Sequence, residues 1–425
     1  MAEPSATAGQ VMDTAAHSWV AEVVLRVLGA ALQIAATWAV VDALTPQDAG
    51  VYFRGFVIAL GLSALVRAKY EIYMAQHIIG RHCAPTDAST GLLLLQLGQR
   101  MLVRASLLCG ILLVVTADLD IQAPQLQRML QIYLPFVLAL PCVSLSTFLG
   151  EALRAANRTL GIVVVAYAVN LSMLLAVALA SEDASLALYS WAFLGGTLIS
   201  ACVAVLLAWR AFPFDLAQRS RPIDLEVLRA VNAREWVGLG RGLLLWGPLG
   251  VLAVWAPAVQ MAQYAAAART ALVVDYFLPA LNLAGCRTTL TAALPVPGSR
   301  QLMLGQLARA LIYSSAFLVV LLALAPATLS IYGMPYDATS TVYAVLLGVQ
   351  WANGVARPAV RQAVARWDGR RIATPVGASA LAAVLVCAAG VANYGALAAA
   401  VGSLIGALML NSRAIAMALS ESTTR

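Results

Sequence analysis

Charged side chains are scarce in this chain. They make up 11% of its 425 residues, whereas 61% are hydrophobic and the mean hydropathy is +0.83. Soluble domains carry about 25% charged residues, so the composition excludes a soluble globular protein and predicts an integral membrane protein. The excess of 27 Lys and Arg over 20 Asp and Glu is assigned to loops that set membrane topology, and no nucleic-acid partner is expected.

Motifs for metal binding, phosphate binding and secretion are also missing. The six cysteines have neither CxxC nor Cys/His metal spacing, so each is predicted to be a small buried hydrophobe and no metal site is expected. No Gly-Lys-Ser/Thr follows a glycine-rich run, which excludes a phosphate loop. The first arginine is Arg26, so a cleaved signal peptide is not expected. No cofactor is predicted.

The chain is instead rich in long apolar runs. Each is about 20 residues long, the length that a helix needs to cross a bilayer, rather than a short alternating strand. We therefore predict an all-α integral membrane protein with about twelve transmembrane helices. They are expected near residues 19–44, 50–79, 92–117, 128–151, 159–180, 186–209, 237–257, 262–283, 304–329, 339–357, 372–392 and 395–418.

The loops between these runs alternate in charge. Those that follow the odd-numbered helices contain no Lys or Arg, and most contain Asp or Glu, whereas those that follow the even-numbered helices carry arginines. The positive-inside rule places the basic loops and both termini in the cytoplasm. The six outer loops are then about ten residues or fewer.

The longest inner loop falls at the midpoint of the chain. It divides the sequence into a cytoplasmic segment (1–18), an N-lobe of helices 1–6 (19–209), the cytoplasmic linker itself (210–236), a C-lobe of helices 7–12 (237–418) and a cytoplasmic tail (419–425). The lobes echo each other, since an outer turn leads to Tyr52 in the first and to Tyr264 in the second. Such parallel repeats occur in transporters.

Several ionisable residues are predicted to lie at membrane depth, where they are costly unless they face a partner or a wet cavity. The eighth span carries Arg269 and Asp275, and Arg54 lies in the outer half of the second. Glu22 and Arg26 lie one turn apart on the first. Asp275 has no partner at i±3 or i±4, so it is either a proton or sodium site or a structural clamp for an arginine of another helix.

Other basic residues lie near enough to the inner surface to snorkel to water. They are Arg67, Lys69, Arg100, Arg104 and Arg241. Next to the last of them, the run GLGRGLLLWGPLG (238–250) fits either a bending gate or close helix packing by small residues.

All but one of the basic residues are arginines. Guanidinium groups offer planar, bidentate donors that match phosphate oxygens and stay charged in a cavity of low dielectric. A cavity lined by Arg26, Arg54 and Arg269 is therefore predicted to bind an anionic headgroup such as a lipid pyrophosphate and to repel cations.

Four stretches carry a resemblance to a known family. The runs ALTPQDAGVYFRGFVIALGLSAL (43–65), EALRAANRT (151–159), AQYAAAARTALVV (262–274) and NYGALAAAVGSLIGALML (393–410) resemble, in order and spacing, segments of the polysaccharide flippases. These belong to the multidrug/oligosaccharidyl-lipid/polysaccharide (MOP) exporter superfamily.

The resemblance implies a two-lobed, MATE-like bundle that works by alternating access in the bacterial inner membrane. It implies a polyprenyl-diphosphate-linked oligosaccharide as substrate, moved to the outer leaflet for O-antigen or exopolysaccharide biosynthesis. Membrane lipid and the polymerase or export components of that pathway are the expected partners. Arg26, Arg54 and Arg269 match the family's cavity arginines. The candidate substrate-binding set is completed by Arg241, Tyr52 and Tyr264.

Three other classes of protein compete with this interpretation. One of them, a non-transporting membrane scaffold, would not need Arg269 and Asp275 at membrane depth. An ion-coupled drug exporter of the same fold would need acidic and aromatic groups in the N-lobe cavity, where this chain has arginine. A membrane-embedded polysaccharide polymerase or glycosyltransferase would need a sizeable outer loop with catalytic groups, and the short outer loops argue against it. The sequence therefore favours a transporter over an enzyme.

Overall fold

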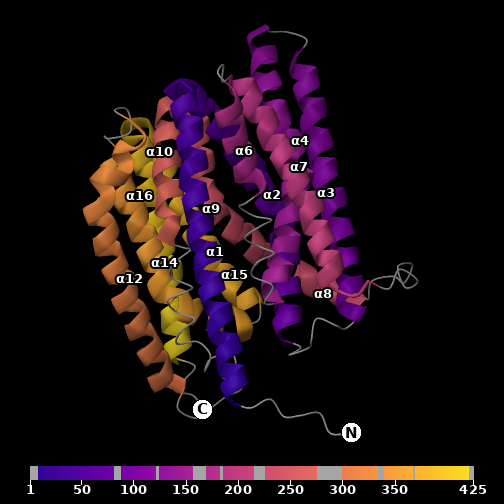
Figure 1. Ribbon diagram of the computed structural model, residues 1–425, viewed down its shortest axis with the longest axis vertical. Helices are drawn as coiled ribbons and strands as arrows, with labels where there is room; N and C mark the ends of the chain where they lie inside the picture. Colours follow the sequence, from indigo (N-terminus) through magenta and orange to yellow (C-terminus); the bar gives the residue numbers. More distant parts are fainter. Residues whose placement is uncertain are drawn as a thin grey trace.

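The computed structural model describes residues 8–80, 88–120, 124–156, 169–181, 185–214, 225–274, 299–333, 339–366 and 369–420. Within these ranges the chain forms helices and no strand. The helices are α1 (Ala8–Ala43), α2 (Pro46–Gly80), α3 (Ala88–Asp120), α4 (Pro124–Ala155), α6 (Val169–Ala180), α7 (Leu186–Ala211), α8 (Leu225–Asn232), α9 (Glu235–Trp255), α10 (Ala258–Ala271), α12 (Ser299–Ser330), α14 (Ser340–Arg366), α15 (Gly369–Tyr394) and α16 (Ala396–Ser420). They run side by side along the long axis of the molecule (Figure 1).

The predicted all-helical membrane fold is confirmed. In the described ranges, eight helices are long and apolar enough to cross a membrane, and the shorter apolar helices Val27–Ala43 and Val169–Ala180 accompany them. Each of the twelve predicted spans overlaps a described helix, and the short α8 is the additional one. The chain is therefore a multi-pass membrane protein.

In the described part of the chain, two boundaries differ from the prediction by more than five residues: α1 begins earlier, and α14, predicted to end at residue 357, runs to Arg366. Helix α1 begins at Ala8 rather than near residue 19, so the described part of the expected N-terminal segment is helical. Helix α10 ends at Ala271, a turn follows at Leu272, and residues 273–274 are helical again. The rest of the span predicted to reach residue 283 lies outside the described residues. In the last turn of α10 the Thr270 hydroxyl donates to the Ala266 carbonyl at 2.8 Å, a local bond that competes with regular helix geometry.

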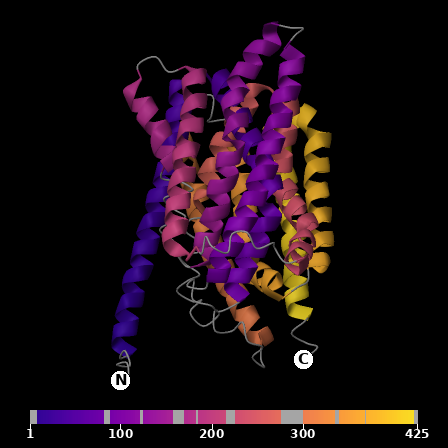
Figure 2. The same ribbon diagram turned by 90° about the vertical axis from the view of Figure 1, so that its right-hand side faces the viewer.

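The helices form two packed groups. Helices α2, α3, α4 and α7 pack on one another in the first half of the chain, and α9, α12, α14, α15 and α16 do so in the second half. The indigo-to-magenta and the salmon-to-yellow groups can be followed in Figures 1 and 2. Helix α2 joins the groups, because it packs on both α9 and α10. We call this contact the seam.

Glycines bring the helices close together at the seam. A Cβ placed on Gly238 of α9 would lie 2.9 Å from the Lys69 backbone nitrogen of α2, and one on Gly242 would lie 3.1 Å from a Leu65 side-chain carbon. On the opposite side of α9, a Cβ on Gly240 would lie 2.7 Å from Val376 of α15. These contacts support the close-packing interpretation of the 238–250 run, because neighbouring helices approach α9 at its glycines on both sides.

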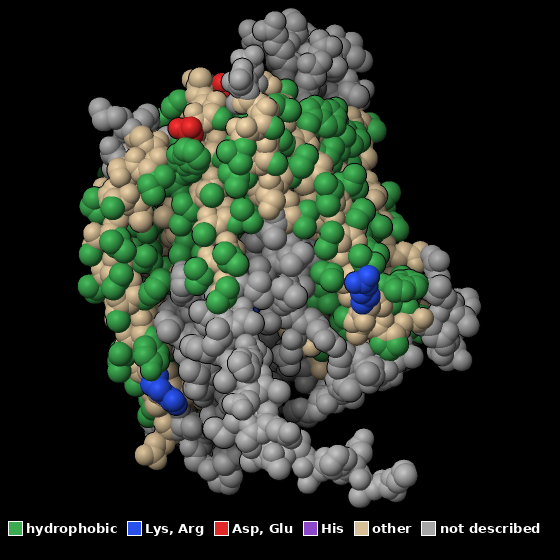
Figure 3. Space-filling view, in the orientation of Figure 1, with side chains coloured by type: hydrophobic (Ala, Val, Ile, Leu, Met, Phe, Trp, Pro, Cys, Tyr) green, Lys and Arg blue, Asp and Glu red, His purple; other side chains and the backbone are tan. Residues whose placement is uncertain are grey.

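The exposed charges separate along the long axis. In Figure 3 the described surface is mostly hydrophobic, with Asp and Glu near the upper end and Lys and Arg nearer the lower end, where the termini lie in Figure 1. This is the separation that the positive-inside rule describes. Which end faces the cytoplasm stays a prediction from the sequence.

Candidate functional site

Arg269 is buried where α1, α2 and α10 meet. Its side chain is 6% exposed. The guanidinium carbon lies 4.6 Å from the ring centroid of Phe56 and 5.8 Å from that of Phe53, and Nη2 lies 3.5 Å from the Gln33 amide oxygen, to which it donates. Two aromatic faces and an amide oxygen offset part of the cost of removing the charge from water.

The local sequence explains this arrangement. Phe53 and Phe56 are three residues apart on α2, so their side chains share one face of the helix. Arg269 lies eleven residues beyond Ala258, or about 17 Å along α10 at 1.5 Å per residue. A buried cation thus lies in the last turn of α10, next to the seam.

Tyr52 lies beside this cation. Its ring is fully buried and makes edge contacts with Phe53, Phe136 and Tyr189 at centroid distances of 5.4, 5.4 and 6.4 Å. Its hydroxyl is within electrostatic range of Arg269 and has no hydrogen-bond partner among the described residues. A buried hydroxyl normally finds a partner, so this oxygen and the guanidinium mark a polar spot inside an apolar bundle.

Arg54 is half-buried and points to the end of the seam. It donates to the carbonyl oxygen of Ala256, the residue that ends α9, and it lies beside the Tyr133 hydroxyl. The bond fastens the turn between α9 and α10 to α2. In this structure the predicted cavity residue therefore contacts a backbone group of the second half.

Helices α2 and α10 approach closely one turn before Arg54. A Cβ placed on Gly50 would lie 1.8 Å from the Ala258 carbonyl oxygen and 2.3 Å from its carbonyl carbon. Both are backbone atoms and cannot rotate away. Glycine is therefore required at position 50 for α2 and α10 to approach this closely.

Gly50→Ala is accordingly expected to separate α2 from α10 and to destabilise the protein by about 1–3 kcal/mol, the usual cost of overpacking. The measurement is the midpoint of thermal unfolding in detergent. Gly305→Ala is the matched control, because a Cβ at that helical glycine meets no atom within 4 Å. Equal unfolding midpoints for Gly50→Ala and Gly305→Ala would contradict this prediction, because α2 and α10 would then separate without loss of stability.

The other predicted site residues that the structure describes are not gathered around Arg269. Tyr264 is buried on another face of α10, with its hydroxyl 3.5 Å from that of Ser403 on α16. Arg241 is exposed on α9. Glu22 and Arg26 belong to α1, but their side chains, like the whole of Asp275, lie outside the described residues.

A second polar cluster fastens the seam at the opposite end from Arg54. Lys69 of α2 is 4% exposed, and its Nζ lies 3.0 Å from a Glu235 carboxylate oxygen and 3.2 Å from the Asn232 side-chain oxygen. Glu235 also lies 3.7 Å from Arg104 of α3. We call Lys69, Asn232, Glu235 and Arg104 the clasp. The sequence predicted that Lys69 snorkels, which is wrong: its partners bury it between the two halves.

The sequence analysis missed several of these residues. Gln33, Phe53 and Phe56 surround Arg269, and a lone glutamine inside an apolar helix was an available signal, since buried amides need partners. The hydroxyls of Thr270 and Tyr332, 2.8 Å apart, tie α10 to the segment after α12. Nothing in the local sequence pairs those two positions.

Comparison with known proteins shows similarity in structure only. The sequence matches no known protein family and no curated protein. A MATE structure in complex with MaD3S superposes with a TM-score of 0.66 at 13% identity, covering 96% of each chain. The chain has a MATE-type transporter fold.

Two further structures support this result. The inward-facing conformation of a multidrug resistance MATE family transporter of the MOP superfamily gives a TM-score of 0.61 at 13% identity, covering 95% of this chain and 98% of that one. The lipid II flippase MurJ, in an inward closed conformation, gives 0.64 at 11% identity, covering 95% and 91%. The predicted MATE-like, two-lobed architecture is confirmed over nearly the whole chain.

Proposed function

We propose that this protein is a flippase that moves polyprenyl-diphosphate-linked oligosaccharide repeat units across the bacterial inner membrane, for O-antigen or exopolysaccharide biosynthesis. The observation that carries the proposal is the buried guanidinium of Arg269 at the junction of α1, α2 and α10. Its planar fork of donors matches a diphosphate.

The charges around this position favour an anionic substrate. The acidic side chains that the structure describes lie toward the ends of the bundle: Asp42, Asp48, Glu71, Glu151, Glu226 and Glu235. Arg269 and the half-buried Arg54 lie between those ends. A phosphate would be attracted to this region, whereas a cationic drug would be repelled.

The position of Arg269 also suits alternating access. Its contacts come from α1 and α2 of the first half, whereas Arg269 itself belongs to α10 in the second half. A rocking motion of the halves would exchange these intramolecular partners for substrate oxygens and expose the guanidinium to one side at a time. The Tyr52 hydroxyl, buried and without a hydrogen-bond partner in the described ranges, would donate to the same substrate.

The neighbours of the same fold include proteins named as multidrug transporters and one named a lipid II flippase. We favour a lipid-linked substrate over a drug because of Arg54 and Arg269. Asp275 is retained in this proposal as the residue that couples transport to protons or sodium, or that holds an arginine in place.

The test is lipid analysis of a strain that lacks the gene, compared with its parent. The flippase assignment predicts that diphosphate-linked repeat units accumulate while surface polymer disappears, and that a plasmid copy of the gene reverses both changes. Unchanged intermediates and polymer together with increased drug sensitivity would instead assign the protein to the drug exporters. Loss of polymer with translocated but unpolymerised repeat units would assign it to the polymerases.

A further inference from the structure

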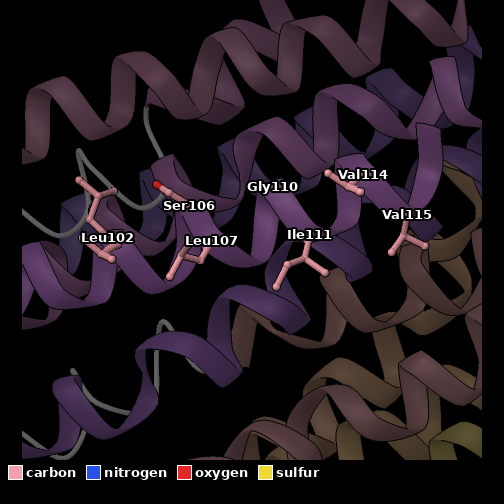
Figure 4. A pocket seen from close by; sticks show the side chains of 8 residues that line it. Leu102, Ser106, Leu107, Gly110, Ile111, Val114 and Val115 are labelled. Atoms are coloured by element: carbon pink, nitrogen blue, oxygen red, sulfur yellow. The ribbon is translucent and has the colours of Figure 1, made fainter. Parts of the chain in front are cut away.

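The exposed side of α3 carries a shallow, open apolar depression with a cationic end, which we call the groove. The groove has a volume of about 690 Å³ and is lined by one face of the helix: Leu102, Val103, Ser106, Leu107, Gly110, Ile111, Val114 and Val115. These residues follow one another along the helix in Figure 4. From Leu102 to Val115 they span about 20 Å along the helix, at 1.5 Å per residue. This is somewhat longer than one leaflet of the hydrocarbon core, which is about 15 Å deep.

The groove lies at the surface of the bundle. Leu107 is 62% exposed, Ile111 59% and Val114 65%. Gly110 leaves the floor open, because a Cβ placed there meets no atom within 4 Å. In a membrane this surface is covered by lipid or by protein, and its length and apolar lining fit an acyl chain.

Two arginines mark one end of the groove. At 100° per residue, Arg100 projects from the same face of α3 as the lining residues and Arg104 from its edge. Both side chains are exposed, and both act electrostatically on the Tyr70 hydroxyl. The Arg104 guanidinium carbon lies 5.6 Å from the Tyr70 ring centroid. The two cations therefore converge beside the same tyrosine.

This end of the groove is at the level of a membrane–water interface. Arg104 lies 3.7 Å from Glu235 in the first turn of α9. The next residue, Trp236, is 73% exposed, as is typical of the aromatic belt at the headgroups. The short helix α8, with Arg229 in its last turn, ends three residues before Glu235.

We propose that the α3 groove with Arg100 and Arg104 is a binding site for an anionic glycerophospholipid. One acyl chain lies along the groove, and the phosphate accepts hydrogen bonds from the two arginines. Basic pockets at the cytoplasmic ends of membrane helices recognise anionic headgroups in this way. The site is separate from Arg269, and the inference does not depend on which substrate the protein carries.

A second copy of the chain fits this surface less well. A dimer in a membrane has its twofold axis along the membrane normal, so the same patch of each copy would meet at the same height. Arg100 and Arg104 would then face their own counterparts, and like charges oppose such an interface. An anionic lipid neutralises them.

The site also touches the clasp. Arg104 shares Glu235 with the buried Lys69. A phosphate bound to Arg104 would weaken the ion pair between Arg104 and Glu235. Glu235 would then pair with Lys69 alone. Occupancy of the groove is thereby coupled to the ion pair that fastens the two halves.

Native mass spectrometry of the purified full-length protein tests the site, with dioleoyl phosphatidylglycerol and dioleoyl phosphatidylcholine as probes. Each basic residue near an anionic headgroup contributes about a fivefold preference, so a preference of about 25-fold for phosphatidylglycerol is expected. The variant Arg100→Gln/Arg104→Gln should lose most of it. Arg309→Gln/Arg413→Gln, which removes two exposed arginines of the second half, should retain it.

A second pair of variants tests the groove. Gly110→Leu fills it and should reduce binding of both lipids at an unchanged unfolding midpoint, whereas Gly305→Leu, at an equally open helical glycine, should not. Three results would overturn the proposal. The Arg100→Gln/Arg104→Gln variant could keep its full preference for phosphatidylglycerol, or the protein could form a dimer that Gly110→Leu disrupts. Undecaprenyl diphosphate could also displace phosphatidylglycerol, which would assign the groove to an isoprenoid chain.

Discussion

Replacing Arg269 with methionine is expected to reduce transport about 100-fold or more while the protein stays folded. Two charge-assisted hydrogen bonds to a diphosphate would be lost, each with a contribution of about 1.5–3 kcal/mol. Methionine keeps apolar contact with Phe53 and Phe56, whose rings flank the guanidinium. The measurement is the ratio of accumulated lipid-linked repeat units to surface polymer, at matched protein levels.

Arg269→Lys is the informative companion variant. Lysine keeps the charge but loses the planar fork, so partial transport is expected. The unfolding midpoint of each variant is measured as well. If Arg269 had only a structural role, its replacement would lower the midpoint but leave the lipid ratio of the remaining folded protein unchanged. Full transport by Arg269→Met would show that Arg269 does not bind the substrate.

The second large effect is expected at the clasp. Glu235→Lys would place a new cation beside the buried Lys69 and close to Arg104. Loss of the partner of a buried charge costs about 3–5 kcal/mol, and Glu235 is 44% exposed, so we expect the lower part of that range. The variant should yield little folded protein and a lower unfolding midpoint.

The charge-swapped double variant Lys69→Glu/Glu235→Lys should recover part of this loss, because it restores opposite charges across the seam. Glu151→Lys is the matched control. Glu151 pairs with Arg154, whose side chain is 56% exposed, and exposed pairs contribute about 1 kcal/mol or less. If the swap recovers no stability, the contact between Lys69 and Glu235 does not hold the halves together.

The sequence predicted the helices well because membrane spans are a local property. About 20 apolar residues in a row determine each span, and twelve such runs correspond to described helices. The depth of Arg269 is a prediction of the same kind, since counting residues along the span 262–283 places it about a third of the way from the outer end.

The partners of the site could not be predicted, because they are distant in sequence. Arg54 contacts Ala256, which is 202 residues away, and Lys69 contacts Glu235, which is 166 residues away. Hydropathy gives the depth of each side chain but not the direction in which it points. Position near the inner surface suggested snorkelling for Lys69, and only the packing of α9 against α2 shows that its Nζ is enclosed.

Lys69 is also the only lysine of the chain, and its amine is enclosed by the clasp. Besides the terminal amine, an amine-selective reagent therefore has a single target, hidden while α2 and α9 stay together. Its labelling rate would report how often this part of the seam opens, with no cysteine or fluorophore engineered into the protein. The protein thus carries a natural single-site reporter of the separation of α2 from α9.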